Sequence, residues 1–239
     1  MISTKNEYKS MFSIIMPCYN AAPYIAEAIK SCLYQTCGDF ELIIVNDGST
    51  DSSKKIINYF LSQSEKIRYF EKENGGPSSA MNYGIEQAKG EIILFVSADD
   101  IQLPNRLEVI KETFKNKIDF CYSGYNHANI KAQPWEYVSP KHLTYENIKN
   151  NVCMSGGAIS GRKYVFDKIK FRDVKVNEDM GLALDLFKSK FKYAMIDVPL
   201  FNYRLLPTGM SYSRKKEVEE ITKQIIKEID EETKNTSIE

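Results

Sequence analysis

Residues 40–51 read FELIIVNDGSTD, and this stretch decides the fold class. Its first half is a near-continuous apolar run of strand length, and its second half is a turn followed by residues that favour a helix start. A strand that is apolar on both faces is typical of a parallel sheet covered by helices on both sides. The stretch therefore predicts one strand–turn–helix unit of an α/β fold.

The same alternation of strands and helices extends through the first hundred residues. Three further short apolar strands are expected, at residues 12–16, 67–70 and 92–96. Between the strands, apolar residues recur at helical spacing. Polar clusters follow three of the strands, at residues 17–20, 46–51 and 97–100. Because ligands of such sheets bind beyond the carboxyl ends of the strands, the clusters predict one site at one edge of the sheet.

The second half of the chain is less regular. A strand at residues 118–122 precedes a loop-rich stretch that contains Trp135, and another strand is expected within residues 152–162. An amphipathic helix begins near Glu178. Two late strands are expected, at residues 193–196 and 200–205, separated by Pro199. Without a repeat or a Gly/Ser linker, a single domain is the simplest interpretation.

The composition excludes several classes of protein. The chain has 239 residues, 43% hydrophobic and 27% charged, as is ordinary for a globular protein. Its 32 basic and 32 acidic residues give zero net charge, which argues against a nucleic-acid-binding partner. No secretory signal is evident in residues 1–10, and no run approaches the roughly 20 apolar residues of a membrane span. Five cysteines without CxxC spacing favour the reducing cytoplasm.

Three groups of acids are candidates for chemistry, and each has a structural alternative. Asp99 and Asp100 follow a strand and suit Mg²⁺ or Mn²⁺, with one of the two expected to ligate, or they form a turn that caps the next helix. Asp47 either hydrogen-bonds a nucleotide base or shapes its turn. Glu178 and Asp179 supply a reactive carboxylate or simply stabilise a helix N-terminus.

Five stretches occur together in an order typical of one family. They are residues 13–33, 40–53, 74–100, 177–188 and 198–211. Over roughly residues 12–213 the chain resembles the family-2 glycosyltransferases, a large inverting family with a GT-A fold. The resemblance implies a single α/β domain with a Rossmann-like, mostly parallel central sheet and helices on both faces.

The resemblance also implies a division of the chain. Residues 12–103 would bind the nucleotide-sugar, and residues 104–213 would bind the acceptor. Residues 1–11 would form a flexible N-terminus, and residues 214–239 a charged amphipathic helix or tail.

Nucleotide-binding roles follow from the resemblance position by position. Pro17 and Tyr19 match residues that flank the nucleotide base. Asp47 matches the aspartate that binds this base, which in the family is usually uracil. Arg204 and the loop to Ser211 match a segment that closes over the diphosphate.

The resemblance also implies the catalytic roles, and the sequence differs from the family pattern at two positions. Asp99 matches the metal ligand at the end of the family's DxD motif, for Mn²⁺ or Mg²⁺, and Asp179 matches the general base. Ser97 replaces the first acid of DxD, so it adds hydrogen bonding but no charge. Met81 stands where the family often has an arginine, directly before the nucleotide-binding candidate Asn82.

The expected activity is transfer of a sugar from a nucleotide-diphosphate donor, usually a UDP-sugar, to a glycan or lipid-linked acceptor in surface polysaccharide synthesis. The length leaves no room for the membrane helices of processive synthases, so one sugar per encounter is expected. A catalytically degenerate binding protein is one alternative, motivated by Ser97 and Met81. A sugar nucleotidyltransferase is another, although residues 17–24 lack the basic Gly-rich loop it needs.

Two features leave several interpretations open. Val218, Ile221, Ile225 and Ile229 form an apolar stripe that packs on its own domain, forms a homodimer seam, or contacts the inner membrane face peripherally. The mixed charges around the stripe weaken the membrane interpretation. Trp135 either stacks on an acceptor sugar or is an ordinary packing aromatic.

Overall fold

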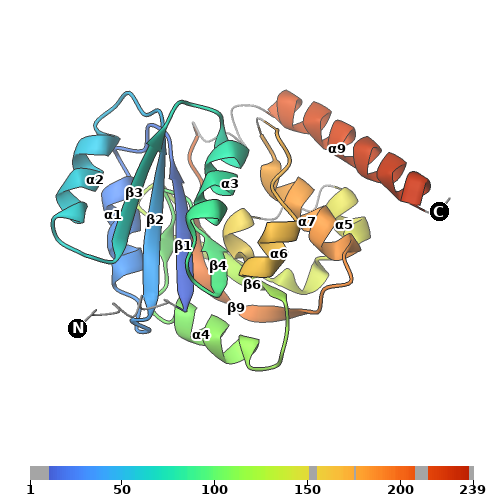
Figure 1. Ribbon diagram of the computed structural model, residues 1–239, viewed down its shortest axis with the longest axis horizontal. Helices are drawn as coiled ribbons and strands as arrows, with labels where there is room; N and C mark the ends of the chain where they lie inside the picture. The colour runs from blue at the N-terminus through green and yellow to red at the C-terminus, as the bar shows by residue number, and fades with distance from the viewer. Residues whose placement is uncertain (1–10, 151–154, 175, 208–214, 237–239) are drawn as a thin grey trace, which may run out of the picture.

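The computed structural model describes residues 11–150, 155–174, 176–207 and 215–236 (Figure 1). The expected N-terminal segment lies almost wholly outside the described residues, as does the segment 208–214. The strands are β1 (Phe12–Cys18), β2 (Phe40–Asp47), β3 (Ile67–Lys72), β4 (Ile92–Phe95), β5 (Ile101–Gln102), β6 (Phe120–Ala128), β7 (Pro134–Val138), β8 (Ile159–Arg162) and β9 (Tyr193–Arg204). The helices are α1 (Ile25–Leu33), α2 (Ser53–Leu61), α3 (Pro77–Gln87), α4 (Arg106–Phe114), α5 (Tyr145–Lys149), α6 (Lys163–Lys168), α7 (Glu178–Lys188) and α9 (Lys215–Thr236), with 3₁₀ turns η1 (Pro140–His142) and η2 (Gly156–Ala158).

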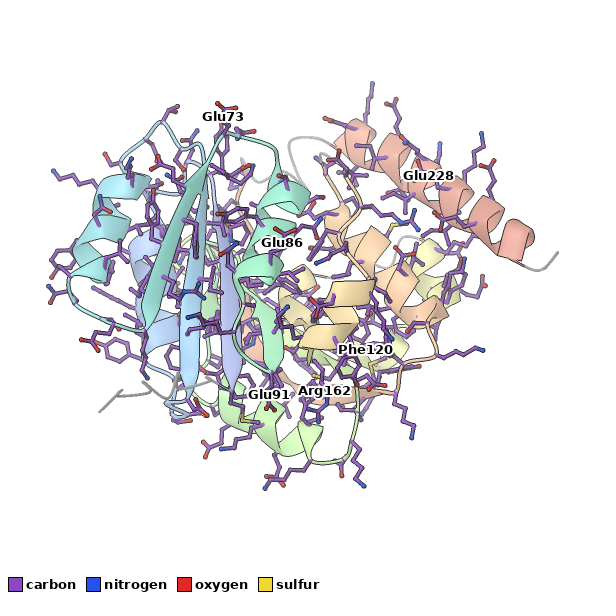
Figure 2. The ribbon with its side chains drawn as sticks, in the orientation of Figure 1. Glu73, Glu86, Glu91, Phe120, Arg162 and Glu228 are labelled. Atoms are coloured by element: carbon purple, nitrogen blue, oxygen red, sulfur yellow. The ribbon has the colours of Figure 1, made fainter. Side chains whose placement is uncertain are left out.

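All of these strands belong to one mixed sheet. Its order is β3-β2-β1-β4-β8-β6-β9-β5, and β7 pairs with β6 outside this path. Strands β1 to β4 are parallel, β8 runs antiparallel to both β4 and β6, and β9 is parallel to β6. Figure 2 shows the reversal, since Glu73 beyond β3 lies at the upper edge and Arg162 at the end of β8 lies at the lower edge. The start of β8 therefore lies beside the end of β4.

Helices cover the sheet on both faces, as the sequence predicts. One apolar cluster joins the sheet to α1, α2 and α4, and a second joins it to α3, α5, α6, α7 and α9. Along β1, Ile14 and Met16 face the first cluster and Ile15 faces the second. This two-sided burial explains the near-continuous apolar strands.

Two predictions for the second half are wrong in detail. The strand predicted to break at Pro199 is one strand, β9. Its pairing with β6 shifts in register on both sides of Gly124, the residue that lies opposite Pro199. The stretch around Trp135 is not a loop, because residues 134–138 form β7 on β6. Both segments become strands through long-range pairing, which overrides their local sequence preference.

The C-terminal helix α9 packs on its own domain (Figure 1). Ile225 and Ile229 are fully buried in the second cluster, and Ile221 packs against it. Arg172 bonds Asp185 of α7 at 2.9 Å and Glu232 of α9 at 2.8 Å, and its guanidinium lies 3.6 Å from Glu228, which Figure 2 labels. Three of the four stripe residues, Ile221, Ile225 and Ile229, therefore pack on their own domain, while the homodimer and the membrane contact stay predictions.

The described helices include none that is both long enough and apolar enough to cross a membrane. The helix α9, although 22 residues long, is interrupted by charged residues throughout.

Candidate active site

The ends of β1 and β2 are tied together by short polar contacts. Asn20, with φ of 51°, accepts a 2.8 Å hydrogen bond at Oδ1 from the Thr50 N–H and donates its own N–H to Ser49 Oγ at 3.0 Å. The Ala22 N–H donates to Asp51 at 2.9 Å. These contacts fix a surface on which Tyr19, 54% exposed, presents its ring to solvent. Pro17, one position before the end of β1, is half-buried.

Asp47 ends β2 and organises the glycine-rich turn before α3. Its buried carboxylate accepts hydrogen bonds from Lys72 Nζ at 2.7 Å, the Gly75 N–H at 3.0 Å and the Gly76 N–H at 2.8 Å. Its predicted contact with a base stays a prediction. Sequence reasoning missed Lys72, the last residue of β3, which supplies a cation at this edge while Met81 is buried in the core.

Asn82 of α3 makes two hydrogen bonds with the backbone of Phe171. Its side-chain amide donates to the carbonyl of Phe171 at 2.9 Å and accepts from the Phe171 N–H at 3.0 Å. This reciprocal pair holds α3 against the segment that follows α6. The contact of Asn82 with a nucleotide stays a prediction.

The acid pair follows β4 at the same edge. These residues lie in a turn rather than in the strand, and they differ in exposure: Asp99 is half-buried and Asp100 is 1% exposed. Asp100 Oδ1 accepts the Arg204 N–H at 2.9 Å, and the Ser97 hydroxyl also bonds this carboxylate. Burial raises the pKa of both acids, and the neighbouring charge of Asp99 raises the pKa of Asp100 further.

This acid pair fits a divalent cation held jointly with a phosphate ligand. Asp100 Oδ2 is buried without a hydrogen-bond partner among the described residues, so one carboxylate oxygen of the pair has its hydrogen-bonding capacity unused. Carboxylate oxygens are the ligands that Mg²⁺ and Mn²⁺ prefer. The described part of the chain has no cluster of three or more His, Cys, Asp or Glu suited to a metal, so water and diphosphate oxygens would have to complete the coordination.

Arg204 is engaged by its own domain. The side chain is 5% exposed, and it donates to Glu27 of α1 at 2.7 Å and to the carbonyl of Ile130 at 2.8 Å. Its guanidinium lies over the ring of Tyr24 at 5.0 Å. The structure places its backbone, through Asp100, at the acid pair, while contact of the side chain with a diphosphate stays a prediction.

Asp179 lies in the first turn of α7 and is held by a turn from another element. Its Oδ2 accepts a 2.7 Å hydrogen bond from the Gly156 N–H. A Cβ at position 156 would lie 2.1 Å from Asp179 Oδ1, so only glycine permits this approach. The turn precedes β8, whose reversed direction brings Gly156 to the same edge as Asp99.

Burial changes the acidity of both acids at the start of α7. It raises the pKa of Asp179 from 3.8 to about 6, while the Gly156 N–H opposes the rise by favouring the carboxylate. Burial, together with the charge of Asp179, raises the pKa of Glu178 from 4.5 to about 8. At neutral pH the pair therefore carries its negative charge mainly on Asp179, which suits it to accept a proton.

Residues 13–170 match the family model described as Glycosyl transferase family 2. The chain belongs to glycosyltransferase family 2. It is 44% identical over 187 residues to an uncharacterised glycosyltransferase of Rickettsia conorii, covering 75% of this chain and 31% of that protein. It is 32% identical over 218 residues to the minor teichoic acid biosynthesis protein GgaB of Bacillus subtilis, covering 84% of this chain and 23% of GgaB. The chain spans between 19% and 64% of the Rickettsia relatives that it matches.

Solved structures confirm the GT-A fold. Staphylococcus aureus TarS 1-349 in complex with UDP-GlcNAc has a TM-score of 0.69 and 21% identity, covering 84% of this chain and 60% of that one. A mannosyltransferase from Pyrobaculum calidifontis in complex with GDP-Man and Mn²⁺ has a TM-score of 0.61 and 18% identity, covering 81% of this chain and 56% of that one.

Within this family-2 domain, Arg106 of α4 is a second residue that sequence reasoning missed. It is 1% exposed, and it donates hydrogen bonds to the carbonyl of Gly157 and, at 3.4 Å, to that of Phe95. Burial lowers its pKa to about 10. Arg106 thus joins the end of β4, which leads to the acid pair, to the turn that holds Asp179. An arginine in an amphipathic helix normally indicates a solvated face, so the sequence carried no signal for this contact.

Proposed function

We propose that the protein transfers a sugar from a nucleoside-diphosphate donor, a UDP-sugar foremost, to a hydroxyl of a glycan or lipid-linked acceptor. One observation carries the proposal: Asp179, fixed by Gly156, lies at the sheet edge that also holds Asp99. Family membership and the similarity to TarS, solved with UDP-GlcNAc, support a nucleotide-sugar donor. The similarity to GgaB supports a role in making a surface polysaccharide.

We propose that the two halves of the sheet divide the substrates. Residues 12–103 would bind the donor, with the base against Pro17 and Tyr19 and the ribose and diphosphate near Ser97 and Asp99. Residues 104–213 would bind the acceptor, since they carry Asp179. The reversal of β8 joins the two halves at one edge, which supports this division.

The chemistry that fits is a single displacement at the anomeric carbon, which would invert its configuration. A divalent cation held by Asp99 would supply Lewis-acid stabilisation of the leaving diphosphate. Asp179 accepts the proton of the acceptor hydroxyl, and its pKa of about 6 leaves it ionised at neutral pH yet more basic than an exposed aspartate. The rise of this pKa above the ordinary 3.8 comes from burial, which is not visible in the sequence.

The residues around Asp179 prepare it for this role. The Gly156 N–H fixes the orientation of the carboxylate. Glu178, with its pKa of about 8, stays protonated at neutral pH and so does not add a second charge beside the base. Asn177, with φ of 59°, directly precedes the helix, and its amide donates to Thr222 of α9 at 2.7 Å.

A thermal-shift panel tests nucleotide binding. UDP, GDP and TDP are each added with and without Mn²⁺. A nucleotide at about 100 times its dissociation constant should stabilise the protein by about 2.7 kcal/mol, or on the order of 5–10 °C in Tm. The absence of a shift with every nucleotide in the presence of Mn²⁺ would refute the proposal.

Donor hydrolysis and transfer test turnover. Hydrolysis of UDP-sugars without acceptor, followed by transfer with acceptor, separates an enzyme from a binding protein, which would shift in Tm but show no turnover. Asp179→Asn should lower transfer by about 10²- to 10⁴-fold while leaving the nucleotide shift intact. The anomeric configuration of the product, read by NMR, tests inversion, and the product length shows how many sugars are added.

A further inference from the structure

Aromatic side chains form a continuous row where β6, β7 and β9 meet. Phe201 stacks on Tyr125 with ring centroids 5.2 Å apart, and Tyr125 lies 5.8 Å from Tyr203. The ring of His127 lies 6.2 Å from Tyr203 and 6.1 Å from Trp135. The row therefore leads from a fully buried phenylalanine to a tryptophan that is 55% exposed.

The buried end of this row touches the turn that positions Asp179. A Cβ placed on Gly157 would lie 3.2 Å from the ring of Phe201, and Gly157 follows directly after Gly156. The exposed end of the row lies near the carboxyl ends of β6 and β9, where Arg204 follows Tyr203. The row thus runs outward from the proposed catalytic base along the acceptor-binding half of the domain.

A β-bulge places Trp135 in the row. His127 pairs with Glu136 and Ala128 pairs with Pro134, so the register between β6 and β7 skips Trp135. Such bulges turn a side chain away from the alternation of the strand. Here the extra residue lies between the partners of His127 and Ala128. Its indole lies beside the imidazole of His127, and Trp135 stays open to solvent.

Polar atoms border the exposed rings. His127 Nδ1 lies 3.0 Å from Glu136 Oε2, and the glutamate side chain is 61% exposed. A pyranose ring presents an apolar face of C–H groups bordered by hydroxyls. The exposed indole can stack on the apolar face of such a sugar. The neighbouring carboxylate and imidazole can hydrogen-bond its hydroxyl groups.

We propose that Trp135, His127, Glu136 and Tyr203 form a subsite for a pyranose unit of the acceptor saccharide, beyond the sugar whose hydroxyl reacts. This proposal rests on the proposed function, because it takes the occupant to be the acceptor glycan. The packing role of Tyr125 and Phe201 inside the row is compatible with it, since only the outer residues would contact the sugar.

Trp135 is the single tryptophan of the chain, so its fluorescence reports directly on this subsite. Chitotetraose, cellotetraose, maltotetraose and mannotetraose serve as probes, titrated to about 10 mM. At least one should quench and blue-shift the emission in a saturable way. No saturable change with any of the four would overturn the subsite. Because this titration uses neither nucleotide nor turnover, failure of the donor proposal shows separately in the thermal shift with UDP and Mn²⁺.

Variants distinguish a subsite from a passive surface. His127→Ala, read by Trp135 emission, should weaken binding of the active tetrasaccharide by about 5- to 10-fold. By saturation-transfer NMR, Trp135→Phe should retain binding and Trp135→Ala should lose it. Tyr59→Ala, at a 63% exposed aromatic of α2, is the matched control and should leave the affinity unchanged. Retention of wild-type affinity by Trp135→Ala would overturn the proposal.

Discussion

Replacing Gly156 with alanine tests whether the position of Asp179 determines the rate. The added Cβ would lie 2.1 Å from Asp179 Oδ1 and 2.6 Å from its Cγ, whereas real Cβ atoms essentially never approach closer than 3.0 Å. The carboxylate must therefore move by about 1 Å, because the close-packed surroundings leave the turn little freedom. The movement also breaks the 2.7 Å hydrogen bond from the Gly156 N–H.

A displacement of about 1 Å in a catalytic group lowers the rate by roughly 10²-fold. We expect Gly156→Ala to lower kcat for transfer by about that factor, with the donor KM changed by less than about 3-fold, since the donor would bind elsewhere. Initial rates at saturating UDP-sugar and Mn²⁺ measure both quantities, and the nucleotide thermal shift confirms an intact donor site.

Gly157→Ala is the matched control within the same turn. Its Cβ would meet the Phe201 ring and Ser155 Oγ no closer than 3.2 Å, so small adjustments suffice and Asp179 stays in place. Its kcat should stay within about 5-fold of wild type. Near-normal transfer by Gly156→Ala would refute the assignment of Asp179 as a base held by this turn, and equal losses in both variants would attribute the effect to the turn alone.

Three further predictions concern charge. Because the pKa of Asp179 is about 6, kcat/KM for transfer should rise with pH up to about 6 and then level, and a profile flat down to about pH 5 would contradict this. Glu178 binds its proton more tightly in the folded protein, where its pKa is about 8, than in the unfolded chain, where the ordinary value is 4.5. The contribution of this proton to folding stability is therefore full below about pH 4.5 and is lost as the pH rises through 8. Because glutamine cannot lose a proton, the stability of Glu178→Gln relative to wild type, measured by urea unfolding, should increase between about pH 5 and 9. Lys72→Met leaves the buried Asp47 carboxylate without its cation and should cost about 2–4 kcal/mol by the same measurement. Lys54→Met, in an exposed pair with Glu71, should leave the stability almost unchanged.

The front half of the fold is predictable because its strands are buried on both faces. The apolar runs and the polar clusters that end them locate β1, β2 and β4 within two residues, and hence the edge where Asp47 and Asp99 lie. β7 and the continuity of β9 could not be predicted, since Pro134 and the polar residues before it indicate a loop and Pro199 indicates a break. Pairing with β6 decides both.

The residues that support the site are less visible in the sequence than the acids themselves. Gly156, Arg106 and Lys72 act through contacts with residues 23, 51 and 25 positions away in the chain, which no local pattern encodes. Asn82 lies in a recognisable motif, yet its hydrogen bonds with the backbone of Phe171, 89 positions away, could not be predicted either.

The end of β9 sets a limit on how chain length can vary in evolution. Tyr203 lies in the aromatic row, while its neighbour Arg204 reaches the opposite way to Glu27. Successive strand residues point to opposite faces of the sheet, so one inserted or deleted residue within β9 would move each of these side chains to the other face. Both contacts would then be lost. Family members that keep this arrangement should therefore differ in length outside this strand and not inside it.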